Sequence, residues 1–391
     1  MDVSMYLEQI DTTEFDNVED YLPSSLGNVI EVNSVGSSFP DLSKAKIAII
    51  GVKEERNAIS NKGCSSAPDF VRNKLYQLYQ GDFEVSVADL GNIVKGDKVE
   101  DTYFALSKVC SELLKEEIVP IIIGGSQDLT YSVYCSFEEL KRTINMAVVG
   151  SGFHLGVAGQ ELDSRSYMSR IILHQPNYLF NFSNIGYQSY FVDQNALDLM
   201  NKLYFDVYRL GEVQADMKEV EPIVRNADML SFDISAIRQS DAPGNKNASP
   251  NGFYGEQACQ IVRYAGLSDK LCSIGLYEFN PDKDNNHQTA HLLAQMAWYF
   301  IEGFSHRKSD YPVGDKSQYT KYRVMVNDNE HEIVFYKSHK SDRWWMNVPY
   351  PESSQLKYER HHLVPCSYAD YQKACEDDIP DRWWKAYKKL C

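Results

Sequence analysis

The sequence predicts a three-layer α/β fold, in which a mainly parallel sheet of eight strands lies between two layers of helices. Eight short apolar runs rich in β-branched residues recur at intervals that leave room for helices, as a parallel sheet buried on both faces requires. Parallel strands joined by right-handed crossovers then carry helices on both faces. The runs are residues 46–52, 84–90, 119–123, 145–149, 184–187, 205–210, 229–234 and 271–277.

Two segments between these runs show the periodicity of amphipathic helices. In residues 101–116 the apolar side chains recur at a spacing that places them on one face. Residues 289–304 form a second such segment, with Gly303 near its end. Functional groups of α/β proteins gather at the carboxyl ends of the strands. Those ends are followed here by residues 124–128, 150–156, 233–236 and 278–281.

The pattern changes on both sides of this region, which we place at residues 44–305. Residues 1–43 are polar and irregular, and we expect an N-terminal arm or edge decoration. In residues 306–391, two strand-like runs flank Asn327-Asp328-Asn329, and Asn and Asp tolerate the positive φ of a hairpin turn. This segment is predicted to be a partly β C-terminal extension.

Large aromatic side chains are concentrated in this extension. A small added module needs apolar anchors to be stable, so we expect the rings to dock the extension onto the main domain, with Trp344 and Trp384 as candidate buried anchors. The alternative is a contact surface for a carbohydrate or a protein partner. The four tryptophans concerned are Trp344, Trp345, Trp383 and Trp384.

The composition excludes several classes of partner. A formal net charge of −16 over 391 residues repels nucleic acid and anionic membranes on average. No run approaches the ~20 apolar residues of a membrane span, and residues 1–20 contain no targeting segment, so we expect a cytoplasmic protein. The eight cysteines are scattered without a Cys-x-x-Cys pair, which gives no sign of a zinc site or a disulfide framework.

Five short motifs carry a resemblance over roughly residues 47–304. They are residues 61–68 (NKGCSSAP), 123–128 (IGGSQD), 149–154 (VGSGFH), 231–235 (SFDIS, followed by Ala242-Pro243-Gly244) and 278–281 (EFNP). In this order they resemble the motifs of the arginase family of ureohydrolases, which includes arginase, agmatinase and formimidoylglutamase. Each motif alone is weak, whereas five in sequence are hard to obtain by chance. The resemblance implies the arginase-like three-layer fold.

The resemblance also implies a chemistry that this sequence departs from. The family uses two Mn²⁺ ions and a bridging hydroxide that attacks a guanidinium or formimino carbon, and two His and four Asp hold the metals. Only Asp233 keeps the residue type that the family uses. Of the other five positions, two hold glycine, two hold neutral polar residues, and one holds a His where the family has an Asp. We therefore expect no manganese cofactor. The six corresponding positions are Gln127, Gly150, Gly152, His154, Asp233 and Ser235.

Glu278 stands where the resemblance implies a carboxylate that holds the substrate's guanidinium. With Asp128 it completes an expected remnant pocket that would bind a small cationic guanidino, amidine or amine ligand. Structural roles remain as alternatives. His154 and Asp233 would then only make hydrogen bonds at strand ends, and Glu278 would pair with an internal Arg or Lys.

The favoured interpretation is a ureohydrolase-fold protein that has lost hydrolysis, a pseudoenzyme with a binding, scaffolding or regulatory role. The alternative is a metal-dependent hydrolase of formimino or guanidino C–N bonds, closest to formimidoylglutamase. The resemblance also implies a homo-oligomer. A serine-hydrolase mechanism is not supported, because no Gly-x-Ser-x-Gly elbow occurs.

Overall fold

The computed structural model describes residues 3–16, 18–157, 159–312, 316–328, 330–351 and 359–390. Its central sheet contains eight parallel strands in the order β4-β3-β5-β10-β9-β6-β7-β8, which confirms the predicted sheet. The strands are β3 (Ile47–Val52), β4 (Val87–Ile93), β5 (Val119–Gly124), β6 (Ile144–Val149), β7 (Leu179–Tyr187), β8 (Asp206–Arg209), β9 (Met229–Asp233) and β10 (Ser273–Tyr277).

The N-terminal segment adds two short strands at the β4 edge of this sheet. β1 (Leu7–Glu8) pairs antiparallel with β4, and β2 (Glu31–Val32) pairs parallel with it. The short helix α1 (Leu26–Val29) buries Leu26 against the same domain. Residues before the main domain therefore decorate an edge of the sheet, while the boundary at residue 43 stays a prediction.

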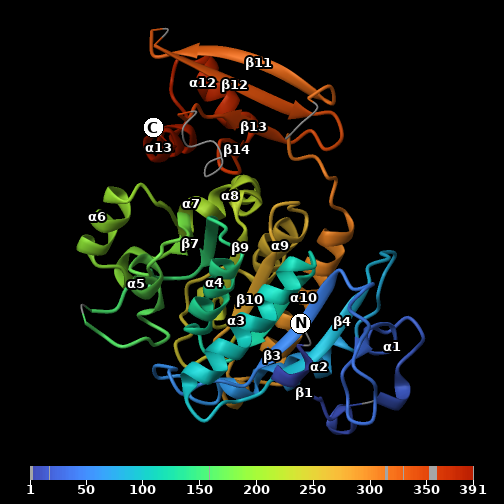
Figure 1. Ribbon diagram of the computed structural model, residues 1–391. Coiled ribbons are helices and arrows are strands. Elements are labelled where there is room, and N and C mark those ends of the chain that lie inside the picture. The colour runs from blue at the N-terminus through green and yellow to red at the C-terminus, as the bar shows by residue number, and fades with distance from the viewer. Residues whose placement is uncertain are drawn as a thin grey trace.

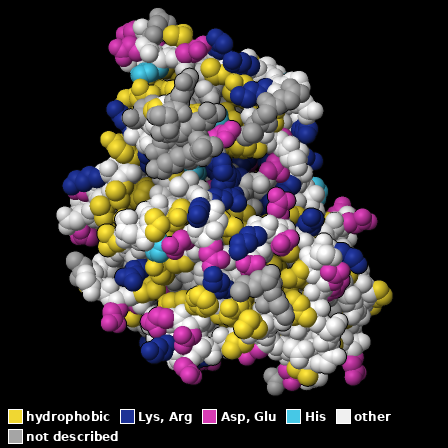
Figure 2. All heavy atoms as spheres, viewed as in Figure 1, with side chains coloured by type: hydrophobic (Ala, Val, Ile, Leu, Met, Phe, Trp, Pro, Cys, Tyr) yellow, Lys and Arg dark blue, Asp and Glu magenta, His cyan; other side chains and the backbone are white. Residues whose placement is uncertain are grey.

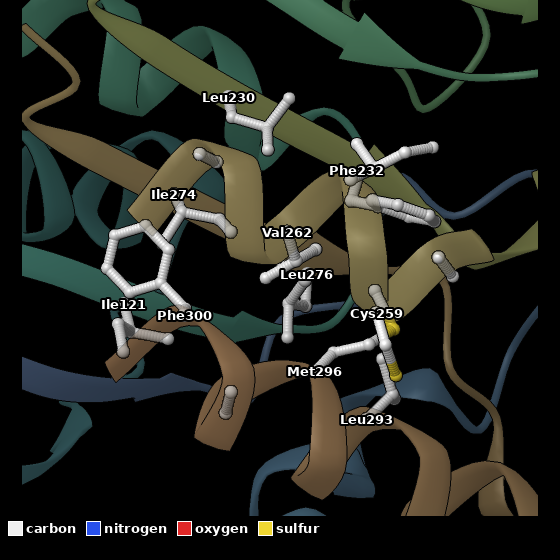
Figure 3. Packing of buried hydrophobic residues seen from close by; sticks show 14 of the residues in the cluster. Ile121, Leu230, Phe232, Cys259, Val262, Ile274, Leu276, Leu293, Met296 and Phe300 are labelled. Carbon is white, nitrogen blue, oxygen red and sulfur yellow. The ribbon is translucent and has the colours of Figure 1, made fainter. Parts of the chain in front are cut away.

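Helices cover both faces of the sheet, as Figure 1 shows. On one face, apolar side chains of α2, α8, α9 and α10 pack on the central strands, and Figure 3 shows α9 and α10 against β9 and β10. On the other face lie α3, α4, α5 and α6. The bounds are α2 (Ala67–Leu75), α3 (Val99–Lys115), α4 (Leu129–Glu139), α5 (Tyr167–Ile172), α6 (Gln194–Lys202), α7 (Leu210–Ala215), α8 (Val220–Asn226), α9 (Gly255–Gly266) and α10 (Gln288–Ser305).

The C-terminal extension forms a second sheet, the C-terminal module. Its strands pair antiparallel in the order β11-β12-β13-β14, and two helices follow. Asn327 and Asp328 have φ of 57° and 52° in the predicted hairpin turn, whereas residue 329 lies outside the described residues. The bounds are β11 (Tyr319–Val326), β12 (His331–Ser338), β13 (Trp344–Asn347), β14 (Leu363–Cys366), α12 (Tyr368–Cys375) and α13 (Asp381–Leu390).

The module lies against α8 of the α/β domain, at the amino ends of the central strands (Figure 1). The buried Arg225 of α8 donates hydrogen bonds of 3.2 Å to the carbonyls of Trp344 and Cys366. Its guanidinium carbon lies 4.5 Å from the ring centroid of Trp345, a favourable cation–π contact. Trp383 is also buried, but Trp384 is 38% exposed, so the expectation of a buried anchor at Trp384 is wrong.

None of the helices in the described part of the chain is long and apolar enough to cross a membrane. The domain boundary near residue 305 stays a prediction, although α10 ends at Ser305.

Candidate functional site

The parallel register brings the motif residues to one edge of the sheet. Asp233 ends β9 and pairs with Tyr277 at the end of β10, so Glu278 follows directly beside it. Gly124, the last residue of β5, leads to Gln127 and Asp128. A cleft of about 780 Å³ opens at this edge, and its lining includes Gly152, His154, Asp233, Ser235 and Glu278.

Glu278 is held in place by hydrogen bonds from amide groups. It is 4% exposed; its Oε1 accepts a hydrogen bond from the Gln127 backbone N–H, and its Oε2 accepts one from the Asn61 side chain, both at 2.8 Å. Among the described residues, no Arg or Lys forms an ion pair with this carboxyl group. Burial raises the pKa of Glu278 to about 8, and the charge of Asp233 adds to this rise.

The backbone at Glu278 is also unusual. Its φ of 69° lies in the left-handed region, which costs a non-glycine residue on the order of 1 kcal/mol. The Glu278 N–H donates to the Gly125 carbonyl at 2.8 Å, and the Asn245 side chain donates to the Glu278 carbonyl at 2.7 Å. These bonds fix the conformation that turns the carboxyl group toward the cleft.

His154 and Asp233 form the second polar element of the cleft. The His154 Nε2 lies 3.5 Å from the Asp233 Oδ2, and the imidazole stacks on Tyr167 with 5.5 Å between ring centroids. Asp233 accepts a 2.8 Å hydrogen bond from the backbone N–H of Ser235. Burial lowers the pKa of His154, and the charge of Asp233 opposes this shift. The lowered pKa favours the neutral imidazole, and its Nε2 makes no hydrogen bond to any described residue.

Gln127 and Asp128 lie behind the cleft in the polar interior. Both are fully buried. The Gln127 side chain donates a 2.8 Å hydrogen bond to Ser231, while its Oε1 has no partner among the described residues. Asp128 accepts a short hydrogen bond from Tyr103, and burial raises its pKa. The structure therefore separates these two residues, and Gly150 with them, from the five that line the cleft.

The two glycines are not required by the backbone. Neither Gly150 nor Gly152 has a positive φ. A Cβ added at Gly150 would meet its nearest atoms at 3.5 Å, and one at Gly152 would meet only the Phe191 carbonyl oxygen at 3.8 Å. At Gly125, in contrast, a Cβ would lie 1.8 Å from the Glu54 carbonyl oxygen. A Cβ atom therefore fits at positions 150 and 152 without displacing its neighbours.

The donor set does not fit a binuclear manganese centre. Two cations held close together need several carboxylates for charge neutralisation and bridging, whereas the six family positions provide the Asp233 carboxylate and the His154 imidazole. Within the described ranges, no group of three or more His, Cys, Asp or Glu side chains is arranged to hold a metal ion.

Sequence reasoning missed the residues that support the cleft. Asn61 and Asn245 hold Glu278, and Asn61 is the first residue of a recognised motif, which was a usable signal. Arg165, at the rim, is exposed and donates a 3.1 Å hydrogen bond to Asn247. It lies in the loop after β6 but beyond the motif at residues 149–154, so only the fold reveals it.

The fold and the site together define a class: a three-layer α/β protein with a polar cleft at the carboxyl ends of its parallel strands. The sequence model of the arginase family matches residues 45–302. The chain belongs to the arginase family, as the motifs predicted.

Relatives with established names are distant but cover most of the chain. A formimidoylglutamase of Bacillus subtilis (strain 168) is 24% identical over 312 residues, which is 70% of this chain and 96% of that protein. One of Staphylococcus haemolyticus is 23% identical over 279 residues, 66% and 86% of the two chains. The structure of Trypanosoma cruzi formiminoglutamase with Mn²⁺ matches with a TM-score of 0.65 at 17% identity, covering 73% of this chain and 99% of that one.

These comparisons correct one expectation. The sequence led us to expect no metal cofactor, but the arginase-family structure that this chain resembles carries Mn²⁺. Family membership implies a binuclear manganese cofactor, and the expectation of none is contradicted. The donor set described above differs from what that cofactor requires.

Proposed function

We propose that the cleft binds a small molecule with a protonated amidine-type group, formimino or guanidino. The observation that carries this proposal is Glu278, a buried carboxyl group that borders a cleft of about 780 Å³ and has no basic partner in the described part of the chain. A planar amidinium group offers two N–H donors to a carboxylate in a charge-assisted pair. Each Glu278 oxygen accepts one hydrogen bond and keeps a further lone pair for the ligand.

Asp233 and His154 supply the other polar groups at this end. The Asp233 Oδ2 and the His154 Nε2 lie 3.5 Å apart, and this imidazole nitrogen has no hydrogen-bond partner among the described residues. A cation bound between the two carboxyl groups would favour their ionised forms. Because the pKa of Glu278 is raised to about 8, binding below that pH releases a proton, and affinity rises with pH.

The rim favours a ligand with an acidic far end. Arg165 lines the cleft and is exposed, and no ion pair of Arg165 occurs among the described residues. Its guanidinium can pair with a carboxylate at the end of the ligand opposite the amidine. A formimino amino acid has both groups, in agreement with the name of the formimidoylglutamase relatives.

A second candidate function is hydrolysis of the formimino C–N bond. The comparisons favour it over a role in binding alone, because relatives that cover 66% and 70% of this chain are named formimidoylglutamases. Family membership implies manganese for such an activity. In this proposal, Glu278 and Asp233 bind and orient the amidine group.

The two candidates are tested together. Titration of the full chain with formimidoylglutamate, agmatine and arginine should raise the melting temperature, whereas glutamate should not. Glu278→Gln should abolish the shift, and Glu256→Gln, an exposed change on α9, should preserve it. Formamide or urea release with added Mn²⁺ would support hydrolysis. Binding without release supports the binding role alone, and no binding by any amidine contradicts both.

A further inference from the structure

Four charged side chains meet where the C-terminal module joins the α/β domain. Arg142, Asp228 and Lys270 precede β6, β9 and β10, so they lie at the amino ends of neighbouring strands. Arg360 precedes β14 and belongs to the module. Figure 2 shows basic side chains gathered at this junction. We call these four residues the seam cluster; it lies at the opposite end of the sheet from the cleft.

Asp228 is the centre of the seam cluster. It is completely buried, and its Oδ1 accepts hydrogen bonds from Arg142 at 3.1 Å and from Arg360 at 2.6 Å. Its Oδ2 accepts one from the Asn145 backbone N–H at 2.9 Å. The Lys270 Nζ lies farther away, 3.9 Å from Oδ2. The carboxylate therefore accepts three hydrogen bonds, and Lys270 lies too far away to donate a fourth.

The cluster contains more positive than negative charge. Among the described residues, Asp228 is the carboxylate within ion-pair distance of Arg142, Lys270 and Arg360, and no second one is. The neighbouring His361 is neutral, because burial holds its pKa well below the usual value. Two positive charges are therefore uncompensated in a partly buried setting, which is costly without a counter-charge.

Several donors in the cluster also lack acceptors. Among the described residues, Arg142 Nε and Arg360 Nη1 have no hydrogen-bond partner, and neither does the ring nitrogen Nδ1 of the buried His361. Lys270, with 7% of its side chain exposed, donates to neutral oxygens of Asn226 and Arg360 at 3.2 and 3.5 Å. The seam remains accessible, since the side chains of Arg142 and Arg360 are 29% and 40% exposed.

We propose that the seam cluster binds a small phosphate-type oxyanion between Arg142, Lys270 and Arg360. The two uncompensated charges match a dianion, and a guanidinium group offers paired N–H donors in the geometry that phosphate oxygens accept. The chain's net charge of −16 repels long polyanions, which favours a free phosphate or a small phosphate ester. The bound anion connects Arg142 of the α/β domain to Arg360 of the module and strengthens their docking.

The test measures phosphate binding to the full chain directly. Equilibrium dialysis with labelled inorganic phosphate should show saturable uptake, and phosphate should raise the melting temperature above that in sodium chloride of equal ionic strength. Arg142→Gln and Arg360→Gln should each weaken binding roughly tenfold or more. Arg323→Gln is the matched control, because Arg323 is 63% exposed on β11 and pairs with Glu332.

Parallel titrations distinguish the source of the anion. Tighter binding of glycerol phosphate than of inorganic phosphate assigns the site to an ester, and equal binding assigns it to the free ion; both support the proposal. The proposal is overturned if dialysis shows no uptake, if succinate binds as tightly as phosphate, or if both arginine variants bind phosphate like the wild type. Dialysis of Arg360→Gln decides the matter even if Arg142→Gln does not fold.

Discussion

The two ends of the central sheet each contain a buried carboxyl group, and the two groups have opposite kinds of partner. At the amino ends, the buried carboxylate of Asp228 has three cations around it, and its pKa is held well below the usual range despite burial. At the carboxyl ends, the similarly buried Glu278 has only amide donors among the described residues, and its pKa is raised. One end uses ionised groups to attach a module, and the other keeps a carboxyl group available to a ligand. Burial alone therefore does not tell a structural carboxylate from a binding one; the partner set does.

The largest expected effect is at the seam. Asp228→Asn leaves Arg142, Lys270 and Arg360 without their carboxylate, which should lower the free energy of unfolding by about 3–5 kcal/mol. Urea denaturation measures the loss, with the exposed Asp82→Asn as control. A lowered carboxyl pKa contributes stability that is lost as the pH falls below the ordinary value of 3.8. The difference in free energy of unfolding between wild type and Asp228→Asn should therefore shrink below that pH. A loss under about 1 kcal/mol at neutral pH would show that Asp228 does not differ from Glu278 in the way described above.

The module interface should depend on one tryptophan and not on its exposed counterpart. Trp345 is 1% exposed and stacks on Arg225, so Trp345→Ala should cost about 3–5 kcal/mol. Trp384 is 38% exposed, and its change to Ala should cost about 1 kcal/mol or less. Thermal denaturation of both variants provides the comparison. Equal losses of unfolding free energy would show that the exposure of a ring does not predict its contribution to stability here.

At the cleft, replacing the Glu278 carboxyl group with a neutral amide should raise the free energy of unfolding, whereas the corresponding change at Asp228 should lower it. A raised carboxyl pKa lowers stability as the pH rises from 4.5 toward 8. Glu278→Gln removes this penalty and should stabilise the protein by about 1–3 kcal/mol at pH 8.5 and much less at pH 5. Denaturation curves at both pH values give the measurement. A variant destabilised at pH 8.5 would show that the loss of one hydrogen bond, from Gln127 or Asn61, which an amide NH2 cannot accept, outweighs the penalty of the charge.

The smallest effect is expected at the glycines of the cleft. Gly150→Ala and Gly152→Ala add a Cβ that meets only ordinary contacts, so each should change the free energy of unfolding by less than about 0.5 kcal/mol. Gly125→Ala, where the added atom would lie 1.8 Å from the Glu54 carbonyl oxygen, should fail to fold or lose several times as much. A large loss at position 150 or 152 would show that the backbone itself requires glycine there.

The sequence predicted the fold because its signal is local. Each β-branched run became a strand of the sheet, and the parallel register then placed Asp233 beside Glu278. Side-chain direction at strand ends is not a local signal. The positive φ values of His154 and Glu278 direct their side chains toward the cleft. Gln127 and Asp128 come from an equally clear motif, but their side chains are buried in the interior.

The seam cluster left no trace in the sequence. Its hydrogen bonds join residues 86 and 132 positions apart, and no motif marks Arg142, Asp228 or Arg360. The cofactor expectation failed for a different reason. Substituted positions describe only what this chain offers a metal, whereas the comparisons describe what the family uses.

The position of Arg360 in the chain has a consequence for biosynthesis. Arg360 lies 90 residues beyond Lys270, so a nascent chain contains Arg142, Asp228 and Lys270 long before it contains Arg360. The α/β domain can pair its buried carboxylate from its own residues and complete its sheet during translation, since domains fold as units in order of synthesis. We expect the C-terminal module to dock on the amino ends of the strands only after the α/β domain has folded.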